Sequence, residues 1–87
     1  MDTLAARLGN EIRKHRLAAG LTQEDLAERS GLHWTYVSQV ERGRRNVSVE
    51  VLLRIGSGLG VAGWQLLQVA EATQPDDESN SRAVGTR

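Results

Sequence analysis

Apolar residues recur every three to four positions along most of the chain, which is the period of amphipathic helices. The pattern predicts a first helix from about Thr3 until Gly20 stops it. Thr22 then has the residue type of an N-cap and begins a short second helix, with acidic residues in its first turn. The side chains expected to face the core are Leu4, Leu8 and Ile12 in the first helix and Leu26 and Ala27 in the second.

The helical pattern is interrupted at Ser30-Gly31-Leu32 and resumes from Trp34 to Arg42. Two short helices joined by a three-residue connection that contains glycine are typical of a helix-turn-helix. The third helix is therefore the candidate recognition helix.

Two more helices are predicted in the second half of the chain. Gly43 ends the third helix, a loop follows, and Ser48 caps a fourth helix that ends at Gly60. Gly56 and Gly58 lie inside that helix and each cost about 0.5–1 kcal/mol relative to alanine. Either a neighbouring backbone comes close at these positions or the helix is weak. A fifth helix is expected from residue 62 to residue 72.

After Thr73 the composition changes to proline, aspartate, glutamate, serine, asparagine and glycine. Such a segment cannot bury enough apolar surface to order itself, so residues 74–87 are expected to form a disordered tail. Residues 1–73 are expected to form one all-α, five-helix domain that serves both DNA binding and dimerisation.

The length and composition restrict the class of protein. A chain of 87 residues buries only about 60% of its unfolded surface, so a partner subunit would add needed stability. The chain has no cysteine, no signal-peptide pattern and no apolar run of about 20 residues. These features predict a soluble, cytoplasmic protein that does not enter a membrane.

The formal net charge is zero, with 11 basic and 11 acidic residues, but the charges are unevenly distributed. Between residues 33 and 54 the basic side chains outnumber the acidic ones, whereas acidic residues cluster at positions 76–78. The basic residues of this region are Arg42, Arg44, Arg45 and Arg54, and its acidic residues are Glu41 and Glu50. A local basic region suited to phosphates therefore exists within a neutral chain.

A helical wheel divides the third helix into two faces. Val37 and Val40 lie on one face, with Tyr36 and Glu41 at the borders. The opposite arc carries Trp34, Thr35, Ser38, Gln39 and Arg42. Short side chains with one amide suit close approach to base edges better than long lysine or glutamate side chains would. An ordinary solvated surface helix is the alternative explanation.

Three blocks in register resemble the Cro/repressor helix-turn-helix superfamily, often called XRE-like. They are residues 20–27 (GLTQEDLA), residues 30–32 (SGL) and residues 37–43 (VSQVERG), and the resemblance extends from about Leu4 to Leu67. Within the superfamily, residues 31–33, 35–38 and 41–48 are similar to controller proteins of restriction–modification systems, which are small dimeric regulators. The sequence departs from these at Trp34, where they commonly carry an arginine that can bind guanine. The resemblance implies a five-helix bundle of the lambda-repressor-like DNA-binding type.

Candidate roles follow from the residue types and from this resemblance. Thr35 and Gln39 are the foremost candidates for reading bases, with Ser38 and Trp34 as further candidates. Trp34 could instead pack against a neighbouring helix, and Tyr36 could pack rather than bind phosphate. The residues expected at the DNA backbone are Gln23, Tyr36, Arg42, Arg44, Arg45 and Asn46.

Other polar residues are expected to be structural. The resemblance implies that Arg16 and Glu41 pair between the first and third helices. His15 lies on the core side of the first helix, and His33 occupies the N-cap place of the third. No metal cluster, paired catalytic carboxylates or nucleophile motif is visible, so we expect no enzyme activity, metal or cofactor.

These features together predict a transcriptional regulator that binds a pseudo-palindromic operator in double-stranded DNA as a homodimer. The subunits would meet through the fifth helix and part of the fourth, around Val51, Trp64 and Leu67. No small-molecule ligand is expected, because no second domain is present to form a pocket. The alternative is an antitoxin-like protein-interaction module that uses the apolar fifth helix or the acidic tail.

Overall fold

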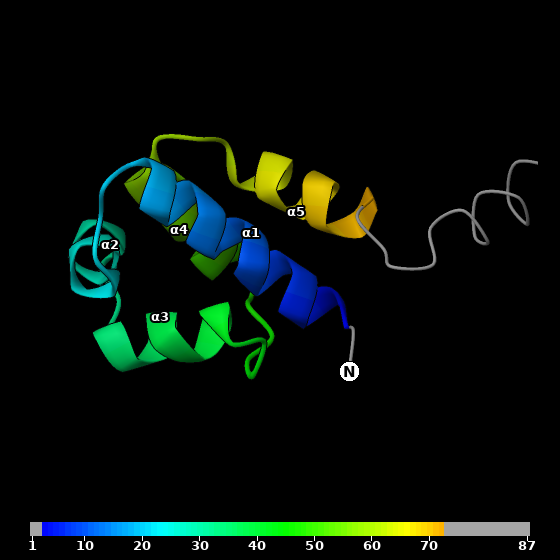
Figure 1. The fold of residues 1–87 in the computed structure, drawn as a ribbon, viewed down its shortest axis with the longest axis horizontal. Coiled ribbons are helices and arrows are strands. Elements are labelled where there is room, and N and C mark those ends of the chain that lie inside the picture. The colour runs from blue at the N-terminus through cyan, green and yellow to red at the C-terminus, as the bar shows by residue number, and fades with distance from the viewer. Residues whose placement is uncertain (1–2, 73–87) are drawn as a thin grey trace, which may run out of the picture.

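The computed structural model describes residues 3–72 and contains five α-helices within that range (Figure 1). They are α1 (Leu4–Ala18), α2 (Gln23–Ser30), α3 (Trp34–Glu41), α4 (Val49–Leu59) and α5 (Gly63–Ala72). The predicted all-α, five-helix fold is thus confirmed, with each helix within one or two residues of its expected bounds. The predicted tail at residues 74–87 and the boundary at residue 73 lie outside the described residues.

Every helix contributes to one hydrophobic core. In each helix one large aliphatic side chain is completely inaccessible to solvent: Ile12, Leu26, Val37, Ile55 and Leu66. Burial of such a side chain stabilises the fold by about 1.5–3 kcal/mol relative to leaving it exposed. Leu4, expected on the buried face of α1, is instead exposed at the first turn.

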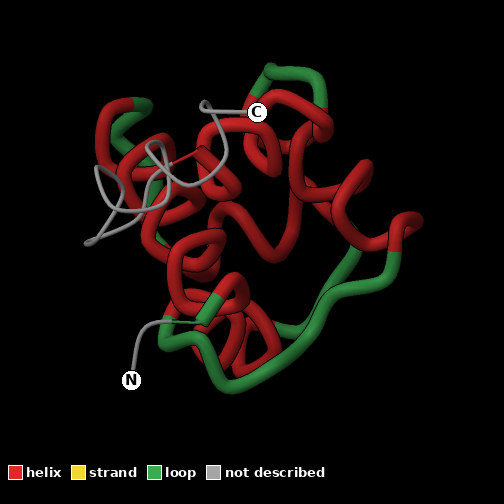
Figure 2. The backbone as a smooth tube through the Cα atoms, turned by 90° about the vertical axis from the view of Figure 1, so that its right-hand side faces the viewer, coloured by secondary structure: helices red, strands yellow, loops and turns green. Residues whose placement is uncertain are grey.

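Each helix packs against at least two others around this core. In Figure 1, α1 crosses the middle of the molecule, with α5 along one side of it and α3 beyond its other side. The second helix packs against both α3 and α4, and α4 packs against α5. Figure 2 shows the connections running along the outside of this bundle. The helix-turn-helix formed by α2 and α3 is therefore supported by α1 and α4.

The glycines inside α4 are explained by close approach of neighbouring elements. A Cβ atom at Gly56 would lie 2.8 Å from the backbone nitrogen of Gly63, where α5 begins. A Cβ atom at Gly58 would lie 2.6 Å from Ser30 Oγ of α2. Of the two explanations that the sequence allowed, close packing accounts for both positions.

The start of α2 is held by a capping box between Thr22 and Asp25. The Asp25 N–H donates to Thr22 Oγ1 at 3.0 Å, and the Thr22 N–H donates to Asp25 Oδ2 at 2.9 Å. Both bonds satisfy backbone donors that the first helical turn would otherwise leave unpaired.

Replacing Thr22 with alanine should lower the free energy of unfolding by about 1 kcal/mol, because the Asp25 N–H loses its acceptor. Urea denaturation near neutral pH measures this change. Gln65→Ala serves as a comparison, because it also removes a side-chain acceptor at the start of a helix: Gln65 Oε1 accepts from the Ala62 N–H before α5. A Thr22→Ala protein as stable as the unmodified one would show that this box contributes nothing.

The same box makes the contribution of Asp25 dependent on pH. The hydrogen bond from the Thr22 backbone, aided by that with its side chain, lowers the pKa of Asp25 from its ordinary value of 3.8. A carboxyl group whose pKa is lowered by folding stabilises the fold at pH values above its unfolded pKa. This stabilisation is lost as the pH falls through the folded pKa. Near neutral pH the protein should therefore be more stable than its Asp25→Asn variant. This difference should vanish in acid, below the folded pKa of Asp25.

Candidate nucleic-acid interface

The turn between α2 and α3 is built by backbone geometry and one side-chain cap. Gly31 adopts a left-handed conformation with φ of 69°, and the Leu32 N–H donates to the Ala27 carbonyl at 2.9 Å. His33 Nδ1 then accepts from the Thr35 N–H at 3.2 Å, which confirms His33 as the N-cap of α3. The turn at Gly31 and the cap at His33 therefore fix where α3 begins.

One face of α3 is buried and the opposite face is accessible. Val37 and Val40 lie in the core, whereas Thr35 and Gln39 are exposed, as the helical wheel predicted. Trp34 is 46% exposed, so packing leaves nearly half of its surface available. The accessible face thus offers an indole, a hydroxyl and an amide.

Ser38 differs from its expected position. Its exposed fraction is 9%, although the wheel placed it on the polar arc of α3. Ser38 precedes Glu41 by about one helical turn, and α3 packs against both α1 and α2. A direct base contact by Ser38 is therefore not supported by its burial.

The segment after α3, residues 42–46, is called the arginine loop below. Gly43 has φ of 74°, its N–H donates to the Val40 carbonyl at 3.0 Å, and the Arg44 N–H donates to the Gln39 carbonyl at 2.9 Å. These two bonds form the Schellman arrangement that ends many helices. The basic and amide side chains of the loop, Arg42, Arg44, Arg45 and Asn46, are all exposed.

Arg45 contacts two side chains of α3. Its Nε donates to Gln39 Oε1 at 2.8 Å, and its guanidinium lies 4.9 Å from the centre of the Tyr36 ring. A cation at this distance over an aromatic face is attracted to it. Sequence reasoning placed Arg45 at the phosphates and missed this contact, because helical periodicity does not extend past Gly43 into the loop.

Arg16 and Glu41 form a buried ion pair that connects α1 to α3. Arg16 donates from Nε to Glu41 Oε2 at 2.6 Å and from a second nitrogen to Oε1 at 3.0 Å. The hydrogen bonds with Glu41 raise the pKa of Arg16 above its ordinary value. The Glu41 side chain is only 2% exposed. This geometry agrees with the pairing that the family resemblance implied.

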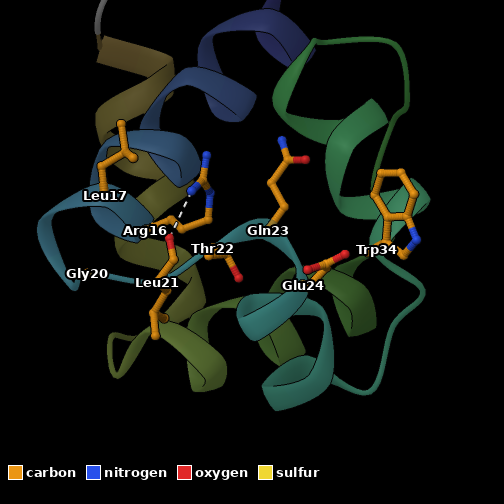
Figure 3. A pocket seen from close by; sticks show the side chains of 8 residues that line it. All are labelled: Arg16, Leu17, Gly20, Leu21, Thr22, Gln23, Glu24 and Trp34. Atoms are coloured by element: carbon orange, nitrogen blue, oxygen red, sulfur yellow. Dashed lines mark hydrogen bonds between the residues drawn. The ribbon is translucent and has the colours of Figure 1, made fainter.

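Gln23, expected at a phosphate, lies beside this ion pair at the start of α2. Its Nε2 donates to Glu41 Oε1 at 3.0 Å, and its side chain is half-buried. It borders an open hollow of about 550 Å³, which Figure 3 shows with Leu17 on one side and Trp34 on the other. Gln23 and Trp34 therefore lie on a common concave surface next to the start of α3.

The residues predicted at a dimer interface are divided between core and surface. Val51 and Leu67 are half-buried against the core, whereas Trp64 is 60% exposed. Two further apolar residues of α4 are exposed and were missed from the sequence: Val49 at 74% and Leu53 at 54%. Gly63 lies against Leu53, because a Cβ atom at Gly63 would lie 3.2 Å from the Leu53 Cα. Trp64 and Leu53 thus belong to adjoining parts of α5 and α4.

The described residues contain no group of three or more histidine, cysteine, aspartate or glutamate side chains arranged to hold a metal ion. His15 Nε2 lies 3.7 Å from Glu11 Oε1 on the same helix. Within residues 3–72, no helix has the length and apolar character needed to cross a membrane.

A helix-turn-helix with an accessible second helix and an arginine loop at its exit defines a DNA-binding protein of the regulator class. A family model described as "Helix-turn-helix domain" matches residues 7–68, and the chain belongs to this family. Within it, the chain is related to the restriction–modification controllers.

Three similar proteins are two such controllers and one transcription factor. The control protein C.MunI of a Mycoplasma species is 40% identical over 82% of this chain and 97% of its own length. The crystal structure of the restriction-modification controller protein C.AhdI from Aeromonas hydrophila has 42% identity and a TM-score of 0.70, covering 71% of this chain and 94% of that one. A hypothetical transcription factor of Neisseria meningitidis is 44% identical over 74% of this chain, which spans 60% of that protein.

Proposed function

We propose that this chain is a transcriptional regulator that binds a pseudo-palindromic operator as a homodimer and controls a restriction–modification system. The observation that carries the proposal is the accessible face of α3, which presents Thr35 and Gln39 and leads directly into the arginine loop. Such a function requires neither catalysis nor a cofactor. It also places the protein in the cytoplasm, where the operator would be.

The dimensions of α3 suit a major groove. Eight residues of helix are about 12 Å long, and the groove is about 12 Å wide. With α3 in the groove, Thr35 and Gln39 would contact base edges, and Trp34 would offer apolar contact to a thymine methyl group. Arg42, Arg44 and Asn46 would neutralise or bind phosphates, and Tyr36 and Gln23 would add hydrogen bonds there.

The dimer is proposed from the exposed apolar residues of α4 and α5. Val49, Leu53 and Trp64 would be covered by the same residues of a second copy, together with the accessible parts of Val51 and Leu67. Self-complementary contact of this kind is usual in two-fold dimers. The two α3 helices would then enter half-sites about 34 Å apart.

Two substitutions separate base reading from phosphate binding. Gln39→Ala should relax the preference at one operator position, with a loss of about 1–3 kcal/mol on the preferred sequence. Arg44→Ala should weaken binding to all sequences alike and reduce the dependence of affinity on salt. Titrations on the preferred duplex and on single-base variants at two salt concentrations measure both effects.

Equal losses from both substitutions on every duplex would refute the assignment of Gln39 as a base reader. Failure of the unmodified protein to bind any duplex at low salt would refute DNA binding itself. The interaction-module alternative depended on the fifth helix and on acidic residues 76–78, and the latter lie outside the described residues.

A further inference from the structure

We infer that Arg45 is a positioning residue that orients the Gln39 amide and thereby makes the protein prefer guanine over adenine at the base facing Gln39. This inference rests on the proposed function, since it assumes that α3 enters the major groove. It assigns to Arg45 a role beyond the phosphate contact expected from the sequence.

The position of Arg45 is set by the backbone as well as by its side chain. The Schellman bonds at Gly43 and Arg44 turn the chain back along α3. Gly43 is also packed against α1, because a Cβ atom there would lie 2.7 Å from the Ala6 Cα. Arg45 therefore follows a tightly held turn, and its guanidinium is retained over the Tyr36 ring.

The hydrogen bond between Arg45 and Gln39 determines which end of the amide faces outward. A guanidinium has only donors, so Arg45 Nε can bond only to the carbonyl oxygen of Gln39, at 2.8 Å. The Gln39 NH2 group is consequently left to donate to another partner. This orientation follows from the chemistry of the two groups.

The consequence concerns the major-groove edges of the bases. Adenine offers N7 as an acceptor and N6 as a donor, so a glutamine binds it through both its NH2 group and its oxygen. Guanine offers two acceptors, N7 and O6. The Gln39 oxygen keeps a second lone pair, but the positive guanidinium bonded to it repels the amino group of adenine, whereas the NH2 group can donate to either acceptor of guanine. The pair of side chains therefore matches guanine.

Arg44 provides a matched control for Arg45. It is the preceding residue, carries the same charge and is exposed, but within residues 3–72 its side chain has no hydrogen bond or ion pair with the protein. Loss of either arginine removes one positive charge from the loop. Only loss of Arg45 frees the Gln39 oxygen.

The test is selection of binding sites from random duplex DNA by the full chain and by Gln39→Ala, Arg45→Ala and Arg44→Ala. The position at which Gln39→Ala loses its preference identifies the base facing Gln39. At that position the unmodified protein should select guanine, and Arg45→Ala should change the guanine-to-adenine ratio by about tenfold in favour of adenine. Arg44→Ala should bind more weakly but keep the guanine preference.

Two results would overturn the inference: adenine selected at that position by the unmodified protein, or the same preference retained by Arg45→Ala. Circular dichroism would verify that each variant keeps its helices. If the unmodified protein selects no sequence, the proposed function fails, which is a different outcome from an unchanged preference in Arg45→Ala.

Discussion

Replacing Glu41 with alanine should lower the free energy of unfolding by about 3–5 kcal/mol, because Arg16 would remain buried without its carboxylate. Among the bonds that Arg16 makes within residues 3–72, that to the Leu21 carbonyl, at 2.8 Å, would remain. The Gln23 amide would lose its acceptor as well. Thermal and urea denaturation measure this change, which is a large part of the 5–15 kcal/mol typical of a whole domain.

The control for this prediction is Glu24→Ala, which removes an exposed carboxylate from the first turn of α2. It should lower the free energy of unfolding by at most a few tenths to 1 kcal/mol, which is the usual contribution of a charge at a helix N-terminus. A double variant, Arg16→Met with Glu41→Leu, should recover much of the stability, since it leaves no buried charge. If Glu41→Ala unfolds no more readily than Glu24→Ala, the ion pair does not support α3.

Replacing Trp64 with glutamate should convert the proposed dimer to a monomer and weaken binding to a complete operator by a factor of about 10²–10⁴. Trp64 is mostly exposed in the subunit, so the substitution should leave the core intact. In the proposed homodimer the two subunits would bind a complete operator as one linked unit, whereas a monomer would gain only the affinity of one half-site. Sedimentation and titrations on complete and half operators test both parts of the expectation.

Asn10→Glu is the matched control, since it adds the same charge to an exposed position of α1. It should leave the oligomeric state unchanged and reduce affinity only slightly. A Trp64→Glu protein that remains a dimer with unchanged operator affinity would show that the exposed face of α4 and α5 is not the interface. An unmodified protein that is monomeric on its operator would refute the homodimer itself.

At Trp34 the recognition surface departs from the controller proteins that the sequence resembles. Controller proteins that the sequence resembles commonly carry an arginine there, and an arginine can bind guanine with two hydrogen bonds. Trp34 cannot do so. The Gln39 and Arg45 pair supplies a guanine preference by other side chains, located toward the opposite end of α3.

The sequence by itself determined the helices and their ends, because these depend on neighbours within one or two turns. Thr22, His33 and Ser48 each cap the helix that follows, and the buried positions Ile12, Leu26 and Val37 follow the helical period. The accessible face of α3 followed from the same periodicity, apart from Ser38.

Only the tertiary structure decided which side chains from different elements meet. The burial of Ser38 depends on how α3 packs against its neighbours, and the need for glycine at position 58 depends on α4 packing against α2. The contact of Arg45 with Gln39 depends on the path of the chain after Gly43. Periodicity describes one helix at a time, whereas these contacts depend on distances between helices and loops that only the packed core sets.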